Sequence, residues 1–286
     1  MSTAIEWTDE TWNPVVGCTK VSQGCKHCYA KTLHDKRHKA ALEGKRMHPQ
    51  YLKPFETVQL MPDRLSRPLH WRKPRRVFVN SVSDLFHEDV PDAFIDQVFA
   101  VMAKTQRHTF QVLTKRPERM RDYCNARLLG LPLPNVWFGV SVENQAAANQ
   151  RIPLLLDTPA AIRWLSCEPL LESVQIAEYL RNPLWNDIPS WQEPAIDWVV
   201  VGGESGADDK ARPFDIEWAR SLVRQCRVGE IPVFVKQLGR HPVAREAGVV
   251  VWPEYDLRDK HGGQMDEWPG DLRIREYPKT REVAAV

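Results

Sequence analysis

Short apolar runs alternate with amphipathic stretches from residue 76 to residue 236 of this 286-residue chain. The apolar runs have the length of buried strands, and the stretches between them repeat their apolar residues at the spacing of a helix. The pattern predicts strands at 76–80, 109–114, 135–142, 161–166, 197–202 and 231–236, and a weaker strand at Val15 and Val16. It predicts helices at 29–43, 91–105, 117–129, 144–156 and 215–227.

Strands that alternate with helices in this way indicate a parallel sheet built from right-handed strand–helix–strand units. Six clear strands and the weaker one favour an α/β fold, a complete or partial (β/α) TIM-like barrel. A doubly wound open sheet is the alternative. We interpret 1–286 as a single barrel domain with a basic insertion at 31–76 after the cysteine loop described below. The C-terminal extension at 240–286 is expected to be irregular, because it is polar and has Gly and Pro scattered through it.

Charge sets the insertion apart from the rest of the chain. Residues 31–76 contain 13 Lys and Arg against 4 Asp and Glu, whereas the whole chain has 39 against 37, which leaves 26 against 33 elsewhere. Such a distribution suggests a polyanionic partner, and nucleic acid is the candidate, although a solvated basic surface gives the same pattern.

The remaining composition narrows the class of protein. A hydrophobic fraction of 43% is typical of a globular chain and argues against disorder. No run is long and apolar enough to span a bilayer, and the polar N-terminus does not resemble a secretory signal. We therefore expect a soluble, cytoplasmic protein with no membrane partner. The sequence leaves the oligomeric state open.

Three of the six cysteines, Cys18, Cys25 and Cys28, lie close together in a polar segment. Six residues separate the first two, and two residues separate the last two. Thiolates are soft ligands for zinc and for iron–sulfur clusters. Gly17 and Gly24 allow the backbone to turn closely around a metal centre. Three protein ligands are typical of an open site, whereas structural zinc sites usually have four.

Other uses of these cysteines are weighed against an iron–sulfur cluster. Zinc fits the spacing if His27 or one of the distant Cys124, Cys167 and Cys226 supplies a fourth ligand. Burial as packing residues is disfavoured by the polar neighbours. A disulfide framework is disfavoured because nothing marks the chain as secreted. Both metal centres accept this spacing, and we favour an iron–sulfur cluster over zinc.

Polar residues follow each clear strand, where the active sites of (β/α) barrels lie. Each one alone has an ordinary explanation as a helix cap or a solvated charge. Together they predict a charged, polar mouth that suits a zwitterionic or polyhydroxylated ligand. The candidate catalytic residues are Lys115, Glu143, Glu168 and Cys167, the last of which could also be a buried strand-end thiol. The candidate cofactor-binding residues are Asn80, Ser81, Ser83, Asp84, Ser141, Gly202, Gly203, Glu204 and Lys236.

A three-cysteine loop after the first strand of a (β/α) barrel resembles the radical S-adenosylmethionine superfamily. The motifs resemble one branch of it, a family of bacterial and phage proteins usually labelled only as phage proteins. The resemblance spans residues 5–240 and rests on segments 6–8, 12–14, 17–30, 80–87, 113–117, 139–144, 166–170 and 202–206. Two features depart from the superfamily pattern around the cysteines: the first gap has six residues instead of three, and His27 replaces an aromatic residue. A third is that Gly202-Gly203-Glu204 comes late in the chain.

The resemblance implies a [4Fe-4S] cluster on Cys18, Cys25 and Cys28. It implies that the iron without a cysteine binds S-adenosylmethionine, and that an electron donor drives reductive cleavage and hydrogen abstraction from a substrate. The basic insertion makes nucleic acid the candidate substrate, for modification or repair. One alternative is a non-catalytic nucleic-acid-binding protein with a structural cluster or zinc. A weaker one is a metal hydrolase with Glu143 or Glu204 as the base.

Overall fold

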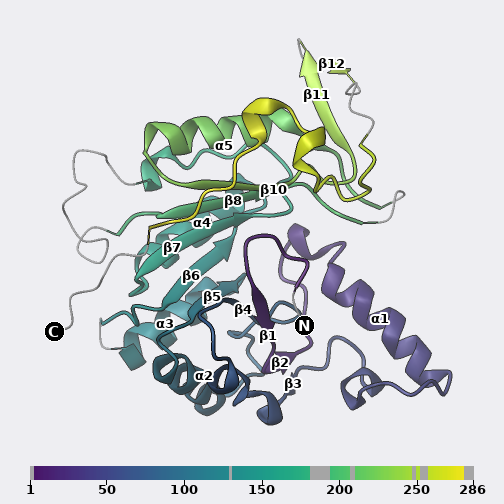
Figure 1. Cartoon of the computed structure of the whole chain (residues 1–286), viewed down its shortest axis with the longest axis vertical. Coiled ribbons are helices and arrows are strands. Elements are labelled where there is room, and N and C mark those ends of the chain that lie inside the picture. Colours follow the sequence, from purple (N-terminus) through teal and green to yellow (C-terminus); the bar gives the residue numbers. More distant parts are fainter. Residues whose placement is uncertain are drawn as a thin grey trace.

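The computed structural model describes residues 3–128, 131–180, 194–206, 210–246, 249–251 and 257–279. Its main element is a curved sheet of seven parallel strands (Figure 1). In sheet order these strands are β1 (Glu10–Trp12), β4 (Arg76–Val79), β5 (Thr109–Thr114), β6 (Val136–Ser141), β7 (Ile162–Cys167), β8 (Trp198–Gly202) and β10 (Val233–Gln237). The sheet order follows the chain order in one direction, so the sheet is a half-barrel. This confirms the predicted partial barrel and excludes the doubly wound alternative, whose strand order reverses.

Helices cover the outer side of this sheet (Figure 1). They are α2 (Asp92–Lys104), α3 (Pro117–Leu128), α4 (Gln145–Leu156) and α5 (Ile216–Val228), and each lies within two residues of its predicted bounds. Local sequence explains where they begin. Asn144 caps α4 by accepting a hydrogen bond from Ala147 N at 2.8 Å, and Asp215 caps α5 by accepting one from Glu217 N at 3.0 Å.

The first strand of the sheet is not the one that the sequence predicted. Val15 and Val16 form β2 (Val15–Val16), which pairs antiparallel with β3 (Gln59–Leu60) in a separate sheet. The seventh strand is β1, which the hydrophobic pattern missed because it contains a charge. Glu10 is buried there, and its carboxylate accepts a hydrogen bond from Arg75 at 2.9 Å. Arg75, which is 65 residues away in sequence, thus compensates the buried charge of Glu10 and allows a polar tripeptide to form a strand.

The two faces of the sheet have different contents. On the outer face, aliphatic strand residues pack against the helices in the main core. On the inner face, a second cluster is built largely from Trp7, Trp137, Trp164 and Trp198. The ring centroids of Trp7 and Trp164 are 5.2 Å apart, and those of Trp164 and Trp198 are 5.4 Å apart. These indoles pack together on the inner face. The polar residues predicted for the site lie at or beyond the carboxyl ends of the strands.

The basic insertion contains α1 (Tyr29–Leu42), β3 and short 3-10 helices at Pro49–Leu52, Pro62–Arg64 and Arg67–His70. The C-terminal extension contains two strands that its polar sequence did not predict, β11 (Pro242–Glu246) and β12 (Val249–Val251). They form a three-stranded sheet with β9 (Phe214–Asp215). Further 3-10 helices lie at Gln23–Cys25, Ala177–Tyr179, Met265–Glu267 and Gly270–Leu272. In the described part of the chain, no helix has both the length and the apolarity needed to cross a membrane.

Candidate functional site

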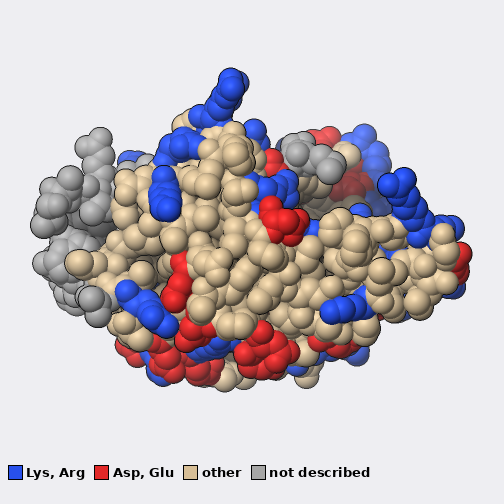
Figure 2. Space-filling model, turned by 90° about the horizontal axis from the view of Figure 1, so that it is seen from below, with Lys and Arg blue, Asp and Glu red and all other residues tan. Residues whose placement is uncertain are grey.

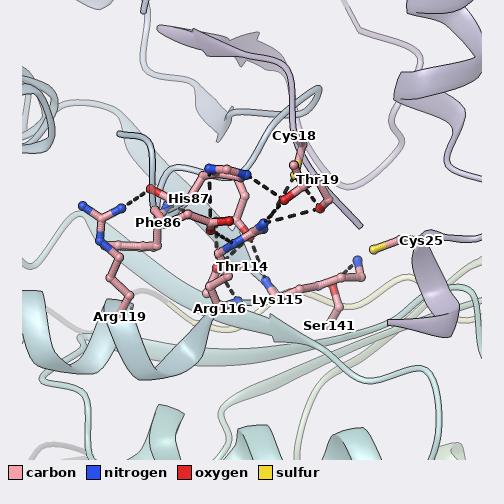
Figure 3. Close-up of polar contacts among 12 residues, drawn as sticks. Cys18, Thr19, Cys25, Phe86, His87, Thr114, Lys115, Arg116, Arg119 and Ser141 are labelled. Carbon is pink, nitrogen blue, oxygen red and sulfur yellow. Dashed lines mark hydrogen bonds and ion pairs between the residues drawn. The ribbon is translucent and has the colours of Figure 1, made fainter. Parts of the chain in front are cut away.

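The three cysteines lie on one loop, residues 17–28, which we name the cysteine loop. It connects β2 to α1 and lies against the carboxyl ends of the parallel strands (Figure 3). Cys18, Cys25 and Cys28 are all free thiols of intermediate exposure. None of them is buried in the core, and none is oxidised, so the thiols remain available as ligands.

Asp84 and Arg116 hold the first part of the cysteine loop, and Figure 3 shows Arg116 with its contacts to Cys18 and Thr19. The Asp84 carboxylate is buried and accepts hydrogen bonds from Thr114 Oγ1 at 2.8 Å and Lys115 N at 3.1 Å. Arg116 donates to Asp84 at 3.4 Å and to Cys18 Sγ at 3.7 Å. Burial raises the pKa of the Cys18 thiol to about 11; Asp84 adds to this rise, and Arg116 opposes it.

Glu143 lies beneath the middle of the cysteine loop. Its carboxylate pairs with Arg151 of α4 at 2.8 and 3.3 Å, and both side chains are almost fully buried. A Cβ added at Gly24 would lie 3.1 Å from Glu143 Cδ, so the loop packs closely on this side chain. Burial opposes ionisation, but Arg151, a hydrogen bond from Ser22 and the charge of Lys115 outweigh it and lower the pKa of Glu143.

Glu204 contacts the last part of the cysteine loop. It accepts hydrogen bonds from Arg212 Nε at 2.9 Å and Nη2 at 2.6 Å, and His27 Nδ1 lies 3.1 Å from the same carboxylate. Burial opposes ionisation of Glu204, but hydrogen bonds from Arg212 and His27 prevail and lower its pKa. An ionised carboxylate that is already paired with arginine is a poor general base, so neither Glu143 nor Glu204 supports the hydrolase alternative.

Two lysines are among the predicted site residues. Lys115 Nζ donates a hydrogen bond to Ser141 Oγ at 2.9 Å. In Figure 3 the Lys115 side chain extends in the direction of Cys25. Lys236 Nζ lies 3.1 Å from Glu168 Oε1. Lys115 has no carboxylate in contact among the described residues. Among the described residues, none of these four side chains has an arginine partner, although Lys236 and Glu168 pair with each other.

The Gly-Gly-Glu segment has a different use from the predicted approach of a ligand. A Cβ at Gly203 would lie 2.4 Å from Leu238 O, and one at Gly202 would lie 2.7 Å from Glu168 Oε1. Real Cβ atoms do not tolerate such distances. Gly203 therefore allows the end of β8 to pack against the chain after β10, and Gly202 leaves room for the Glu168 carboxylate.

The polar residues after β4 also hold the mouth together. Asn80 adopts a left-handed backbone conformation, with a φ of 58°, and its Oδ1 accepts a hydrogen bond from Val15 N at 3.3 Å. Ser83 Oγ donates to Val15 O at 2.7 Å, and Ser81 Oγ donates to Asn13 Oδ1 at 3.2 Å. With Asp84, these side chains bind neighbouring chain segments, so the predicted contact with a cofactor has no support from their geometry.

The other three cysteines are buried in the main core. Cys167 is fully buried in the core between the sheet and the helices, where burial raises its pKa well above the ordinary value. This position supports the packing interpretation rather than the catalytic one. Cys124 and Cys226 are buried in the same core. None of the three is placed to complete a zinc site with the cysteine loop.

Among the described residues, no three His, Cys, Asp or Glu side chains are grouped as a ready-made metal site. The cysteine loop supplies soft donors, but its thiols would have to draw together around a metal centre. The sequence also missed residues that shape the site, namely Thr19, Arg151 and Arg212. The one available signal was Arg151, which lies on the same face of the predicted helix as the apolar residues Ala147, Ala148 and Leu155.

Fold and site together define an α/β half-barrel whose strand-end mouth is covered by a loop with three free cysteines. The chain belongs to the family described as "Protein of unknown function (DUF5131)", whose model matches residues 2–270. No curated protein matches it.

Two solved structures of spore photoproduct lyase are similar to the chain. One, a cysteine-to-serine mutant, has 12% identity and a TM-score of 0.43, covering 89% of this chain and 71% of that one. The other, in complex with a dinucleoside spore photoproduct, has 11% identity and a TM-score of 0.33, covering 74% and 58%. Identities this low say nothing of shared chemistry.

Proposed function

We propose that this protein is an iron–sulfur enzyme of the radical S-adenosylmethionine type. Cys18, Cys25 and Cys28 would hold a [4Fe-4S] cluster at the mouth of the half-barrel. The observation that carries this proposal is the position of three free thiols on one loop against the carboxyl ends of the strands. Active sites of (β/α) folds lie at this end.

The donor chemistry fits such a cluster. Thiolates are the usual ligands of iron–sulfur centres, and three of them leave one iron for another ligand. A bound cluster, reduced by one electron from an external donor, would supply the electron that breaks the bond from sulfur to C5′ in S-adenosylmethionine. The products would be methionine and a radical able to take a hydrogen atom from the substrate. The chain's own residues bind, orient and shield the reactants.

Four side chains are proposed to bind the zwitterionic end of S-adenosylmethionine. Lys115 and Lys236 offer ammonium groups for a carboxylate, and Glu168 offers a carboxylate for an amino group. Ser141 fixes the direction of Lys115. Lys236 and Glu168 pair with each other and would exchange that contact for the two charged groups of the ligand. Asp84, Glu143 and Glu204 are excluded from this role because an arginine holds each of them.

Nucleic acid is the proposed substrate. The basic insertion has nine exposed lysines and arginines, which are Lys36, Arg37, Lys39, Lys45, Arg46, Lys53, Arg67, Arg72 and Lys73. In the face shown in Figure 2, acidic side chains gather mainly along one edge, and lysines and arginines stand out over the rest. Tyr29, at the start of α1, is 53% exposed and donates a hydrogen bond to Ser81 O at the mouth. An exposed aromatic ring at the mouth is suited to stack on a base.

Anaerobic preparation of the full chain tests the proposal. We expect brown protein that contains iron and sulfide, and formation of 5′-deoxyadenosine after addition of dithionite and S-adenosylmethionine. A variant with all three loop cysteines changed to alanine should show neither result. Colourless protein with stoichiometric zinc, prepared anaerobically with ample iron, would contradict the proposal.

The exposed basic surface also favours a second candidate, a non-catalytic nucleic-acid-binding protein with a structural cluster or zinc. It predicts salt-sensitive binding of nucleic acid without cleavage of S-adenosylmethionine. The 5′-deoxyadenosine assay separates the two candidates, because only the enzyme forms that product.

A further inference from the structure

Three arginine–carboxylate pairs lie against successive parts of the cysteine loop. Asp84–Arg116 contacts Cys18 and Thr19, Glu143–Arg151 lies beneath Gly24, and Glu204–Arg212 contacts Gln23 and His27. We infer that the third pair is a positioning group: Glu204 and Arg212, acting through His27, fix the cysteine loop over the mouth before any metal binds.

The geometry of this pair supports the inference. Arg212 donates to Glu204 through Nε, Nη2 and its backbone N, at 2.9, 2.6 and 2.9 Å. The Glu204 side chain is only 5% exposed and that of Arg212 is 20% exposed, so water competes little for these bonds. Residues 204 and 212 follow β8 and are remote from the loop in sequence, so the contact is a tertiary anchor.

The pair contacts the loop on both sides of Cys25. Arg212 Nη1 donates to Gln23 O at 3.1 Å, and His27 Nδ1 lies 3.1 Å from Glu204 Oε2. Between these two contacts lies the turn that carries Cys25, and Cys28 follows directly. Fixing residues 23 and 27 therefore limits the directions that both thiols can take. Arg116 has the same effect on Cys18 through its bond to Thr19 Oγ1 at 2.8 Å.

A loop held in this way loses less conformational entropy when its thiols bind a metal centre. This consequence rests on the proposed function. The anchor itself does not, because every contact in it is made by the chain alone. The two statements can therefore be tested separately.

Limited trypsin digestion of the full, metal-free chain reports the anchor directly. Lys20 and Lys26 are exposed and lie within the cysteine loop, so cleavage after either one measures how often the loop opens. We expect His27→Ala to accelerate cleavage after Lys26 by about tenfold, because it removes a hydrogen bond to a buried charge. His27→Asn, whose amide can donate to Glu204, should restore much of the protection.

Arg212→Lys is the second variant, since it keeps the charge and loses the forked contact. It should also accelerate cleavage. The matched control is Arg220→Ala. Arg220 lies on α5, where it forms hydrogen bonds with Glu217 of the same helix and with Asp271, and among the described residues it makes no polar contact with the cysteine loop. It should leave the cleavage rate unchanged. Melting temperatures measured in parallel distinguish opening of the loop from global unfolding.

Unchanged cleavage after Lys26 in both His27→Ala and Arg212→Lys would overturn the anchor. A second readout addresses metal binding. In anaerobic reconstitution, the two variants should take up iron more slowly than the wild type, whereas Arg220→Ala should not. If the wild type takes up no iron, the proposed function fails and the digestion result still decides the inference.

Discussion

At the scale of single residues, a charge at a strand end says little about its availability for chemistry. Glu143 and Glu204 follow strands as catalytic carboxylates do, yet each is paired with a buried or half-buried arginine. Lys115 occupies an equivalent position and contacts only a hydroxyl group among the described residues. The arginine partners therefore determine which strand-end charges are available to a ligand. Arg151 lies on α4, and Arg212 lies in the loop before β9.

The loop cysteines carry the first prediction. Changing Cys18, Cys25 or Cys28 singly to serine should lower bound iron after anaerobic reconstitution by at least about tenfold, since even indirect partners of a metal site have effects of that size. Iron analysis and visible absorbance measure this. Cys124→Ala is the control, because Cys124 is buried in the core beside the helices and should affect stability without changing iron content.

His87 makes stability depend on pH. It is fully buried, and Asp89 N donates to its Nδ1 at 3.1 Å, which suits a neutral ring. Burial and the charge of Arg116 lower its pKa below the ordinary 6.5. As the pH falls, His87 therefore binds a proton in the unfolded chain at a higher pH than in the folded protein. The contribution of His87 to the free energy of unfolding is at its full value above about pH 6.5 and decreases as the pH falls below it.

The corresponding experiment compares wild type with His87→Asn in urea unfolding at pH 7.5 and pH 5.5. The free energy of unfolding of the wild type should fall more between these values than that of the variant. His108, whose pKa is also lowered, is present in both proteins and does not affect the comparison. Equal losses in the two proteins would exclude His87 as the source.

At the scale of elements, the hydrophobic pattern located six of the seven strands in the main sheet and the five α-helices of the described residues. It failed at β1, β11 and β12: the first and last of these are only three residues long, and the first two contain charged residues. β1 depends on Arg75 to neutralise Glu10, and β11 depends on pairing with β9. A pattern read along the chain cannot contain such partners, because they lie far apart in sequence.

The junction of β8 and β10 carries an element-scale prediction. Gly203→Ala places a Cβ 2.4 Å from the backbone oxygen of Leu238, which cannot move aside as a side chain can. We expect the free energy of unfolding to fall by about 1–3 kcal/mol, as in other overpacked positions. Gly206→Ala is the control, because the nearest atom would be Ala211 Cβ at 3.8 Å. Similar urea midpoints for both variants would contradict this account of the Gly-Gly segment.

At the scale of the whole molecule, the topology brings the predicted site residues to one edge of the sheet, but it does not assign a role to each of them. Parallel strands in chain order bring their carboxyl ends to one edge, so the contact of the cysteine loop with Asp84, Glu143 and Glu204 follows from the fold. The division of these residues into supports and ligand contacts depends on Arg116, Arg151 and Arg212. That division required three-dimensional distances.

The exposed charge of the basic insertion carries the last prediction. Lys36 and Arg46 are exposed and have no ion-pair partner among the described residues. If they contact phosphates of single-stranded DNA, the slope of log affinity against log salt should become shallower by about 0.7 for each one changed to alanine, or about 1.4 for both. Fluorescence anisotropy across a salt series measures this slope. Lys104→Ala with Arg224→Ala removes the same charge from the helices that cover the outer face of the sheet, and should leave the slope unchanged. Equal slopes for the two double variants would mean that net charge, rather than the insertion, attracts the nucleic acid.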